Sequence, residues 1–288
     1  MDAFDQLHPG VQYHLVNTLR WNGLRPTQAD AVEPILAGRD ALVLAPTAGG
    51  KTEAAAFPLL SRMAGEDWQG VSVLYVCPLR ALLNNLQPRI DGYCNWLGRS
   101  AEVWHGDVGQ AQRQRILADR PDILLTTPES IESMLVSTKV DPRVLFSGLR
   151  AVVVDEIHAF AGDDRGWHLL AILERLARIA GRDLQRIGLS ATVGNPEELL
   201  QWLQGSAYGR DSTVIAPTAA AATTSAPEIT VDFVGSLANA AKVIASLHSG
   251  EKRLVFVDSR RRAEELGSAI AEYGIETYIS HSSLSAAE

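Results

Sequence analysis

The segment APTAGGKTEAA, Ala45–Ala55, constrains the fold more than any other part of the chain. It follows the short apolar run ALVLA and leads into TEAAAFPLLSRM, which begins with good helix-forming residues. The pattern therefore predicts a buried strand, a glycine turn and a helix in succession. Gly49 and Gly50 allow a sharp turn in which successive backbone N–H groups point into one concavity, and the positive end of the helix dipole adds to it. Such a turn is typical of phosphate binding.

Two further residues of this segment indicate that the phosphates belong to a nucleotide. Lys51 stands at the helix start, where its ammonium group can reach β- and γ-phosphates. The hydroxyl of Thr52 is placed to ligate Mg²⁺. A helix that merely opens after a glycine-rich loop is the alternative, and the flanking strand and helix favour the nucleotide site.

Composition describes a soluble protein without disulfides. The chain has 288 residues, 46% of them hydrophobic and 21% charged, and its net charge is −8. Any nucleic-acid site must then be a local patch built partly from backbone amides and hydroxyls. The cysteines Cys77 and Cys94 have no metal-ligand spacing and read as reduced thiols, with Cys77 buried at a strand end. Neither a membrane span nor a signal peptide is indicated, which predicts a cytoplasmic protein.

Short apolar runs alternate with longer stretches that have helical periodicity. This pattern predicts an α/β fold with a mostly parallel sheet and helices on both faces. In such sheets the functional groups gather at the carboxyl ends of the strands. The runs are ALVLA from Ala41, VSVLYV from Val71, AEVWH from Ala101, DILLT from Asp122, AVVVD from Ala151 and RIGLS from Arg186.

Polar clusters follow these runs and predict a functional rim. In DEIH, Asp155 could hold Mg²⁺ and Glu156 could orient or deprotonate a water molecule. In SAT, the hydroxyls of Ser190 and Thr192 suit hydrogen bonds to Glu156 or His158, although a plain helix cap is the alternative. A glutamine before the turn, Gln28, could pair with N6 and N7 of adenine, or could be an ordinary surface residue.

The low-complexity stretch APTAAAATTSAP predicts a boundary between domains. We expect a first domain over residues 1–215, a linker over 216–228 and a second αβ domain over 229–288. The second part contains the apolar runs ITVDFV, RLVFVDS and ETYIS with two helical stretches between them. These are fewer elements than a doubly wound domain needs, so the pattern predicts a truncated second domain.

Taken in order, these motifs resemble the superfamily 2 helicases of DEAD/DEAH type. The sequence carries the glutamine, the glycine-rich turn, CPLRALLNN, TTPES, DEIH, SAT and LVFVDSR in that family's order. More narrowly, DEIHAFAGDDRGWHLLAILERL and the late HSSLS resemble the Lhr-like (large-helicase-related) branch. The resemblance implies a RecA-like P-loop NTPase domain followed by part of a second one. One departure is Ala48-Gly49, where the family usually has Gly-Ser.

The resemblance also implies a role for each matching residue. ATP and Mg²⁺ would be bound by Gln28, Ala48, Gly49, Gly50, Lys51, Thr52 and Glu53, with Thr52 and Asp155 as the metal ligands and Lys51, Asp155 and Glu156 as the catalytic set. His158, Ser190 and Thr192 would couple the ATP site to the nucleic acid. Backbone contacts to the nucleic acid would come from Pro78, Leu79, Arg80, Thr127, Pro128 and Glu129, and more weakly from Trp104, His105, Gly106 and Asp107. Trp167 and His168 are expected to be packing residues.

The favoured hypothesis is an ATP-dependent helicase or translocase that moves along single-stranded DNA or RNA, or along a DNA–RNA hybrid. A 3′-to-5′ direction follows from the resemblance alone. The alternative is a non-motor ATP-binding switch or assembly module, and a small-molecule kinase fits DEIH and SAT poorly. The 288 residues contain no arginine-finger motif of the QxxGRxxR type, so this chain is expected to bind ATP but to hydrolyse it very slowly.

Overall fold

The computed structural model of the protein describes residues 2–46, 48–191, 193–217, 229–247 and 250–280. The chain divides into two compact units, Met1–Ala222 and Thr223–Glu288. Most of the predicted linker, residues 218–228, lies outside the described residues, so the domain boundaries drawn from the sequence stay a prediction.

The first unit is built on a seven-stranded sheet in the order β3-β4-β2-β5-β6-β1-β7, in which every pair of neighbouring strands is parallel. The predicted α/β fold is therefore confirmed. The strands are β1 (Asp40–Leu44), β2 (Val73–Val76), β3 (Ala101–Trp104), β4 (Ile123–Thr126), β5 (Ala151–Val154), β6 (Gln185–Ser190) and β7 (Ser212–Ile215). Each of the predicted runs in this unit forms a strand, and β7 is an edge strand that the sequence patterns did not reveal.

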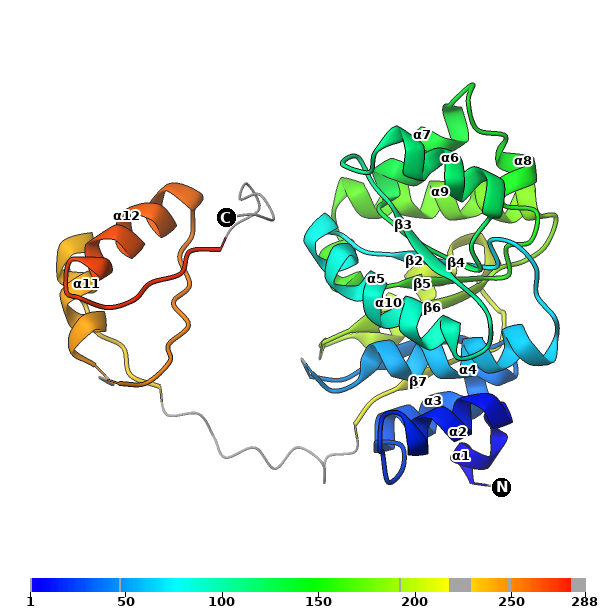
Figure 1. The fold of residues 1–288 in the computed structure, drawn as a ribbon, viewed down its shortest axis with the longest axis horizontal. Coiled ribbons are helices and arrows are strands. Elements are labelled where there is room, and N and C mark those ends of the chain that lie inside the picture. The colour runs from blue at the N-terminus through cyan, green and yellow to red at the C-terminus, as the bar shows by residue number, and fades with distance from the viewer. Residues whose placement is uncertain (1, 47, 192, 218–228, 248–249, 281–288) are drawn as a thin grey trace. The chain divides into compact units, whose positions relative to one another are not determined.

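Helices cover both faces of the sheet (Figure 1). Successive strand residues point to opposite faces, so Tyr75 and Val153 join one apolar core while Leu74 and Val152 join the other. The first core packs against α1 (Ala3–Gln6), α2 (Pro9–Asn17), α3 (Pro26–Leu36), α4 (Lys51–Gly65) and α5 (Arg80–Asn95). The second packs against α6 (Gln110–Asp119), α7 (Pro128–Val136), α8 (Pro142–Leu145), α9 (Asp164–Ala180) and α10 (Pro196–Gln204). Short 3₁₀ turns occur at η1 (Ile157–Ala159) and η2 (Gly205–Ala207).

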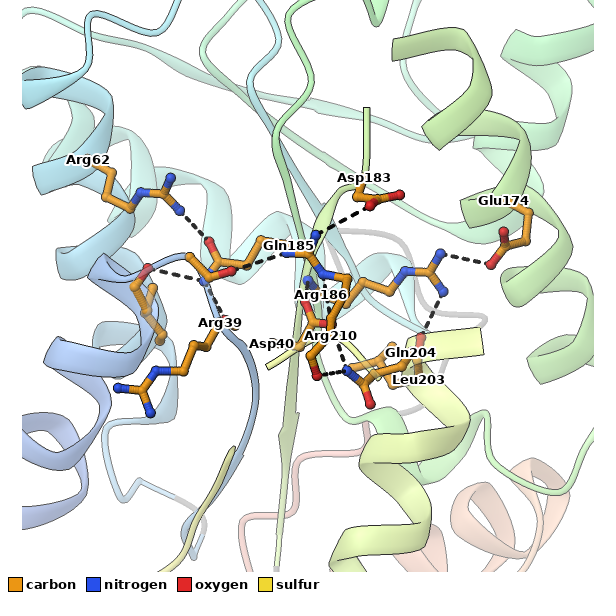
Figure 2. Close-up of polar contacts among 12 residues, drawn as sticks. Arg39, Asp40, Arg62, Glu174, Asp183, Gln185, Arg186, Leu203, Gln204 and Arg210 are labelled. Carbon is orange, nitrogen blue, oxygen red and sulfur yellow. Dashed lines mark hydrogen bonds and ion pairs between the residues drawn. The ribbon is translucent and has the colours of Figure 1, made fainter. Parts of the chain in front are cut away.

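A buried polar network fastens the amino ends of the central strands (Figure 2). Asp40, fully buried at the start of β1, accepts the backbone N–H of Arg186 at 2.8 Å and the side-chain amide of Gln204 at 3.0 Å. The Arg186 guanidinium donates to the carbonyl of Leu203 at 2.9 Å and pairs with Glu174 at 2.8 Å. The network therefore ties β1 and β6 to α9 and α10 at the edge of the sheet opposite the glycine-rich turn.

The second unit contains α11 (Leu237–Ser246) and α12 (Arg260–Ala271), which pack together through Ala241, Leu266 and Ile270. The predicted helices are present, but the strands predicted from ITVDFV, RLVFVDS and ETYIS are wrong for the residues that the structure describes. A strand needs a neighbour to accept its ladder hydrogen bonds. Phe233 and Phe256 are instead 98% and 85% exposed.

Candidate functional site

The strand register brings three of the predicted motifs to one edge of the sheet. Leu44, the last residue of β1, lies beside Ser190 of β6. Val154, the last residue of β5, lies beside Gly188 of the same strand. The glycine-rich turn, SAT and DEIH therefore leave adjacent strands at their carboxyl ends, as expected for a parallel sheet.

The turn between β1 and α4 requires its glycines. Gly50 has φ +83° and caps α4, and a Cβ atom there would lie 2.3 Å from the side-chain nitrogen of Gln28. At Gly49 a Cβ atom would lie 2.8 Å from the carbonyl oxygen of Pro46. Ala48 also has a positive φ of 62°. A small residue with a left-handed backbone thus stands where the sequence departs from the family pattern.

Lys51 is the first residue of α4 and is buried. Its ammonium group donates to the carbonyl oxygens of Ala45 at 2.9 Å and of Pro46 at 3.4 Å. Within the described part of the chain no carboxylate forms an ion pair with Lys51 at 4.0 Å or less. The lysine is therefore held over the turn by neutral acceptors, with its charge open to an incoming phosphate.

Residues of α5 support the start of α4. Arg89 donates to the Thr52 hydroxyl at 2.9 Å and lies 3.5 Å from the Glu53 carboxylate. The hydroxyl of Tyr93 donates to the same carboxylate at 3.0 Å. Sequence analysis missed both residues. Their spacing of four places them on one face of α5, but nothing local in the sequence identifies the helix that this face meets.

Asp155 follows β5 and is buried. It accepts the Tyr75 hydroxyl at 2.8 Å and the backbone N–H of Glu156 at 2.9 Å. Burial raises the pKa of Asp155, the Tyr75 hydrogen bond opposes that rise, and the Glu156 charge adds to it. The charge of Lys51 lowers the same pKa, which shows that the two groups interact across the site.

The oxygen donors near the turn fit Mg²⁺. The Thr52 hydroxyl and the Asp155 carboxylate are hard ligands of the type that this ion prefers. The described residues contain no cluster of three or more histidine, cysteine or acidic side chains able to hold a metal. A Mg²⁺ ion bound by one or two side chains and completed by phosphates and water needs no such cluster.

Glu156 and His158 link this region to β6. Glu156 adopts a left-handed backbone with φ 49°, which turns the chain sharply into η1. His158 Nδ1 lies 2.9 Å from the Ser190 hydroxyl and 3.5 Å from the Glu156 carboxylate. The expected contact between SAT and DEIH is thus present through Ser190, whereas Thr192 lies outside the described residues.

Gln28 is placed differently from the simplest expectation. Its side chain is buried, and its oxygen accepts the Arg25 backbone N–H at 3.0 Å. Its nitrogen donates to the Gly50 carbonyl at 3.3 Å. The amide therefore braces the glycine-rich turn, and only its remaining N–H and lone pair are available to a base.

The turns predicted to contact nucleic acid leave neighbouring strands. Val76 of β2 lies beside Thr126 of β4, so Pro78–Arg80 and Thr127–Glu129 emerge together. Leu79 is 55% exposed, and Thr127 caps α7 with its hydroxyl near the Ser130 N–H. Arg80 pairs with Asp107 at 2.8 Å, and both side chains are more than half exposed.

The adjacent loop after β3 is held from inside. His105 is buried, its Nε2 lies 2.8 Å from the Asn84 oxygen, and burial lowers its pKa. Arg113 donates to the carbonyl oxygens of His105 and Gly106 at 3.1 and 3.0 Å. The loop therefore presents Gly106 and Asp107 outward, while His105 is part of its support.

The first turn of α9 contains one residue that is placed differently from the prediction and one contact residue that was not predicted. Trp167 is 65% exposed, so its predicted packing role is wrong, whereas His168 lies 3.4 Å from Glu132 of α7. Arg165, to which sequence analysis gave no role, bonds to the Glu129 carboxylate at 2.8 Å and to the Pro78 carbonyl at 3.1 Å. The only signal for it was its place in the run DDRGWH.

Known proteins carry the same pattern. Residues 25–199 match the family model of the DEAD/DEAH box helicases. The chain is 37% identical over 273 residues to a Lhr helicase/probable uracil glycosylase of Mycolicibacterium smegmatis, covering 87% of this chain and 18% of that protein. It is 36% identical over 221 residues to the ATP-dependent helicase Lhr-Core of Methanothermobacter thermautotrophicus, covering 71% of this chain and 25% of that protein. The chain thus spans a quarter or less of the length of these two relatives.

Solved structures agree with this assignment. A structure of Mycobacterium smegmatis helicase Lhr bound to ssDNA and AMP-PNP has a TM-score of 0.81 and 33% identity, and it covers 100% of this chain and 40% of that one. A structure of the DUF1998 helicase MrfA bound to DNA has a TM-score of 0.74 at 24% identity over 93% of this chain and 39% of that one, and it supports the fold alone. The predicted resemblance to Lhr-like helicases is confirmed.

Proposed function

The chain belongs to the DEAD/DEAH box helicase family, and we propose that it is the ATP-binding part of an ATP-dependent nucleic-acid translocase or helicase. The proposal extends to its ligands, which we take to be Mg-ATP and a single strand of DNA or RNA, alone or within a DNA–RNA hybrid. The similar structure of Mycobacterium smegmatis helicase Lhr supports this choice, since it contains ssDNA and AMP-PNP.

One observation carries the proposal. The carboxyl edge of a single parallel sheet holds a phosphate-binding turn after β1, a buried carboxylate after β5, and two turns after β2 and β4. The turn after β2 exposes Leu79 and Arg80, whereas in the turn after β4 Thr127 and Pro128 are buried and Glu129 is exposed. Since β2 pairs with both β5 and β4, it stands between the carboxylate and the turn after β4. A nucleotide site and a strand-binding surface can therefore be coupled through one short stretch of sheet.

Lys51 and the N–H groups at the start of α4 would bind the phosphates of ATP. Thr52 and Asp155 would hold Mg²⁺, which when bound neutralises charge on the β- and γ-phosphates. Glu156 would orient the attacking water and accept its proton, because it directly follows Asp155 and its side chain is 35% exposed and therefore open to water.

His158 would couple conformational changes at the nucleotide site to the SAT turn after β6. Its Nδ1 lies 2.9 Å from the Ser190 hydroxyl and 3.5 Å from the Glu156 carboxylate, so one ring nitrogen stands next to both groups. The β6 strand that carries Ser190 lies between β5 and β1. A shift of Glu156 during hydrolysis would therefore change the surroundings of the same His158 nitrogen that contacts Ser190, the first residue of the SAT turn.

The test measures whether the two ligands are linked. Binding of a fluorescent single-stranded thymidine oligonucleotide should strengthen when Mg-AMP-PNP is added to the wild-type chain. Lys51→Ala should abolish nucleotide binding by calorimetry and leave oligonucleotide binding insensitive to the nucleotide. Lys139→Ala, an exposed lysine on another surface, serves as the matched control. Nucleotide binding without any oligonucleotide binding would instead indicate a non-motor ATP switch.

A further inference from the structure

One arginine joins three strand ends on the surface described above. Arg165, in the first turn of α9, donates through Nε to Glu129 Oε1 at 2.8 Å and through a terminal nitrogen to the Pro78 carbonyl at 3.1 Å. Its guanidinium carbon also lies 5.4 Å from the centre of the Phe160 ring. Pro78 follows β2, Glu129 follows β4, and Phe160 belongs to the segment that follows β5. These strands are neighbours in the order β4-β2-β5.

The backbone beside Arg165 is built to hold it in place. A Cβ atom at Gly166 would lie 2.1 Å from the Phe160 carbonyl oxygen and 2.9 Å from the Trp202 ring. Only glycine permits α9 to start this close to the chain that leaves DEIH. Phe160 itself is fully buried. The guanidinium therefore projects from a backbone position that packing has already determined.

The stability of α9 does not explain the arginine. A cation in the first turn of a helix is opposed by the helix dipole. The Arg165 and Glu129 side chains are 37% and 53% exposed, and an ion pair this open contributes little to stability. Burial would raise the pKa of Glu129, but hydrogen bonds from its own backbone N–H and from Arg165 outweigh it and lower that pKa. Glu129 is thus held as a carboxylate against Arg165.

We propose that Arg165 is a positioning residue, which holds the Pro78 and Glu129 turns at one spacing on the nucleic-acid surface and ties both to the segment after DEIH. The inference rests on the proposed function. Because one rigid, forked donor meets a carbonyl and a carboxylate together, lysine cannot reproduce the arrangement. The role differs from that of a direct phosphate ligand, because it depends on the two hydrogen bonds that the guanidinium donates to the protein and on no contact with the nucleic acid.

The first experiment compares oligonucleotide affinity across a salt series. Arg165→Ala and Arg165→Lys should each weaken binding of a labelled single-stranded thymidine oligonucleotide by about five- to tenfold. The slope of the logarithm of affinity against the logarithm of salt should stay unchanged, because no phosphate contact is lost. Mg-ATP affinity should also stay unchanged. Full rescue by lysine, with a slope reduced by about one in the alanine variant, would identify a direct phosphate ligand and overturn the proposal.

The matched control is another arginine of the same helix. Arg175 pairs with Glu132 of α7 at 2.6 Å, and the two side chains are 42% and 30% exposed. Arg175→Ala also removes a positive charge from α9 and an ion pair between α9 and α7. It leaves the Pro78 and Glu129 turns untouched. It should lower oligonucleotide affinity by much less than Arg165→Ala. Equal losses of oligonucleotide affinity in the two variants would show that only the missing positive charge matters, which would contradict the proposal.

The second experiment tests whether removing the Glu129 charge strengthens or weakens oligonucleotide binding. Glu129→Gln removes a negative charge from the proposed nucleic-acid surface, which by electrostatics alone should strengthen binding. If Arg165 positions this turn through Glu129, the variant should bind more weakly, and the double variant with Arg165→Ala should lose less than the sum of the single losses. Stronger binding by Glu129→Gln would overturn the inference.

The outcomes separate this inference from the proposed function. If the wild-type chain binds no single strand of DNA or RNA, both fail. If it binds and Arg165→Ala binds equally well, only the positioning role fails. Thermal melting identifies a variant that does not fold, and in that case Arg165→Lys and Glu129→Gln, which keep most of the packing, decide the result.

Discussion

The hydroxyl of Tyr75 on β2 donates a hydrogen bond of 2.8 Å to the carboxylate of Asp155, the residue that follows β5. The register makes this contact possible, because Tyr75 lies beside Val153. Burial and the Asp155 charge raise the pKa of Tyr75 well above its usual range, so the phenol remains a donor. Even so, burial raises the pKa of Asp155. The hydrogen bonds to Asp155, the predicted metal ligand, therefore offset only part of the cost of burying its negative charge.

This finding predicts that Asp155→Asn stabilises the ligand-free protein at neutral pH. The raised pKa means that the folded chain holds the carboxyl proton more tightly than the unfolded chain, so wild-type stability is lost as pH rises through the folded-state pKa. Asparagine carries no charge, and its single oxygen can still accept the Tyr75 hydrogen bond, while the Glu156 N–H loses its side-chain acceptor. Its advantage in melting temperature should be largest at neutral pH, should shrink as pH falls through the raised folded-state pKa, and should be gone below the usual pKa of aspartate. Asp141→Asn, a change at the exposed cap of α8, is the control. A lower melting temperature at neutral pH would contradict the prediction.

Gln28→Ala should reduce both nucleotide affinity and base selectivity. An amide that makes two hydrogen bonds to adenine is worth about 1–3 kcal/mol of discrimination, so the wild-type chain should prefer ATP to GTP by roughly fivefold or more. Because Gln28 also bonds to the Gly50 carbonyl, the variant should bind GTP more weakly as well. Competition binding against a fluorescent ATP analogue measures both affinities, and Gln112→Ala on α6 is the control. Equal wild-type affinity for ATP and GTP would remove Gln28 from base selection.

Asp107→Asn should strengthen nucleic-acid binding. Asp107 forms an ion pair with Arg80 on the surface, where both side chains are exposed, and it competes with phosphate for that arginine. An exposed pair of this kind is worth at most about 1 kcal/mol, so the gain in oligonucleotide affinity should be about two- to fivefold. Asp119→Asn changes the net charge equally at the far end of α6. If both variants gain equally, Asp107 has no specific effect on Arg80.

Arg186→Ala should destabilise the first unit without altering its ligand sites. The substitution leaves the Leu203 carbonyl and the Glu174 carboxylate without their buried donor, shown in Figure 2. Breaking a buried pair costs on the order of 3 kcal/mol. Denaturant unfolding measures the loss, with the exposed Arg143→Ala as control. Nucleotide affinity of the folded variant should match wild type, because Lys51 lies at the opposite end of β1 from this network. If Arg186→Ala lowers the free energy of unfolding by less than the control does, the buried network around Arg186 is not needed for stability.

Local patterns in the sequence determined most of the first unit. Apolar runs of a few residues between helical stretches identified β1 to β6, because strands buried on both faces are largely apolar, and the edge strand β3 still has buried residues at its two ends. The glycine-rich turn, DEIH and SAT could be placed at one edge because the strands of such a sheet are parallel and their carboxyl ends lie together. The run STVI of β7 was missed because it begins with two hydroxyl residues and only its last residue is fully buried, so its apolar pattern is weak.

Tertiary structure alone decided which distant groups meet. Arg89 reaches Thr52, Arg165 reaches Pro78 and Glu129, and Asp40 accepts from Arg186, yet no periodicity links these positions. It also decided against the predicted strands of the second unit, whose apolar runs have the right composition but no neighbouring strand. A side chain's immediate sequence determines whether its backbone can form a strand, helix or turn. Its partners across the sheet depend on the strand order, which the chain acquires only when all its elements pack together.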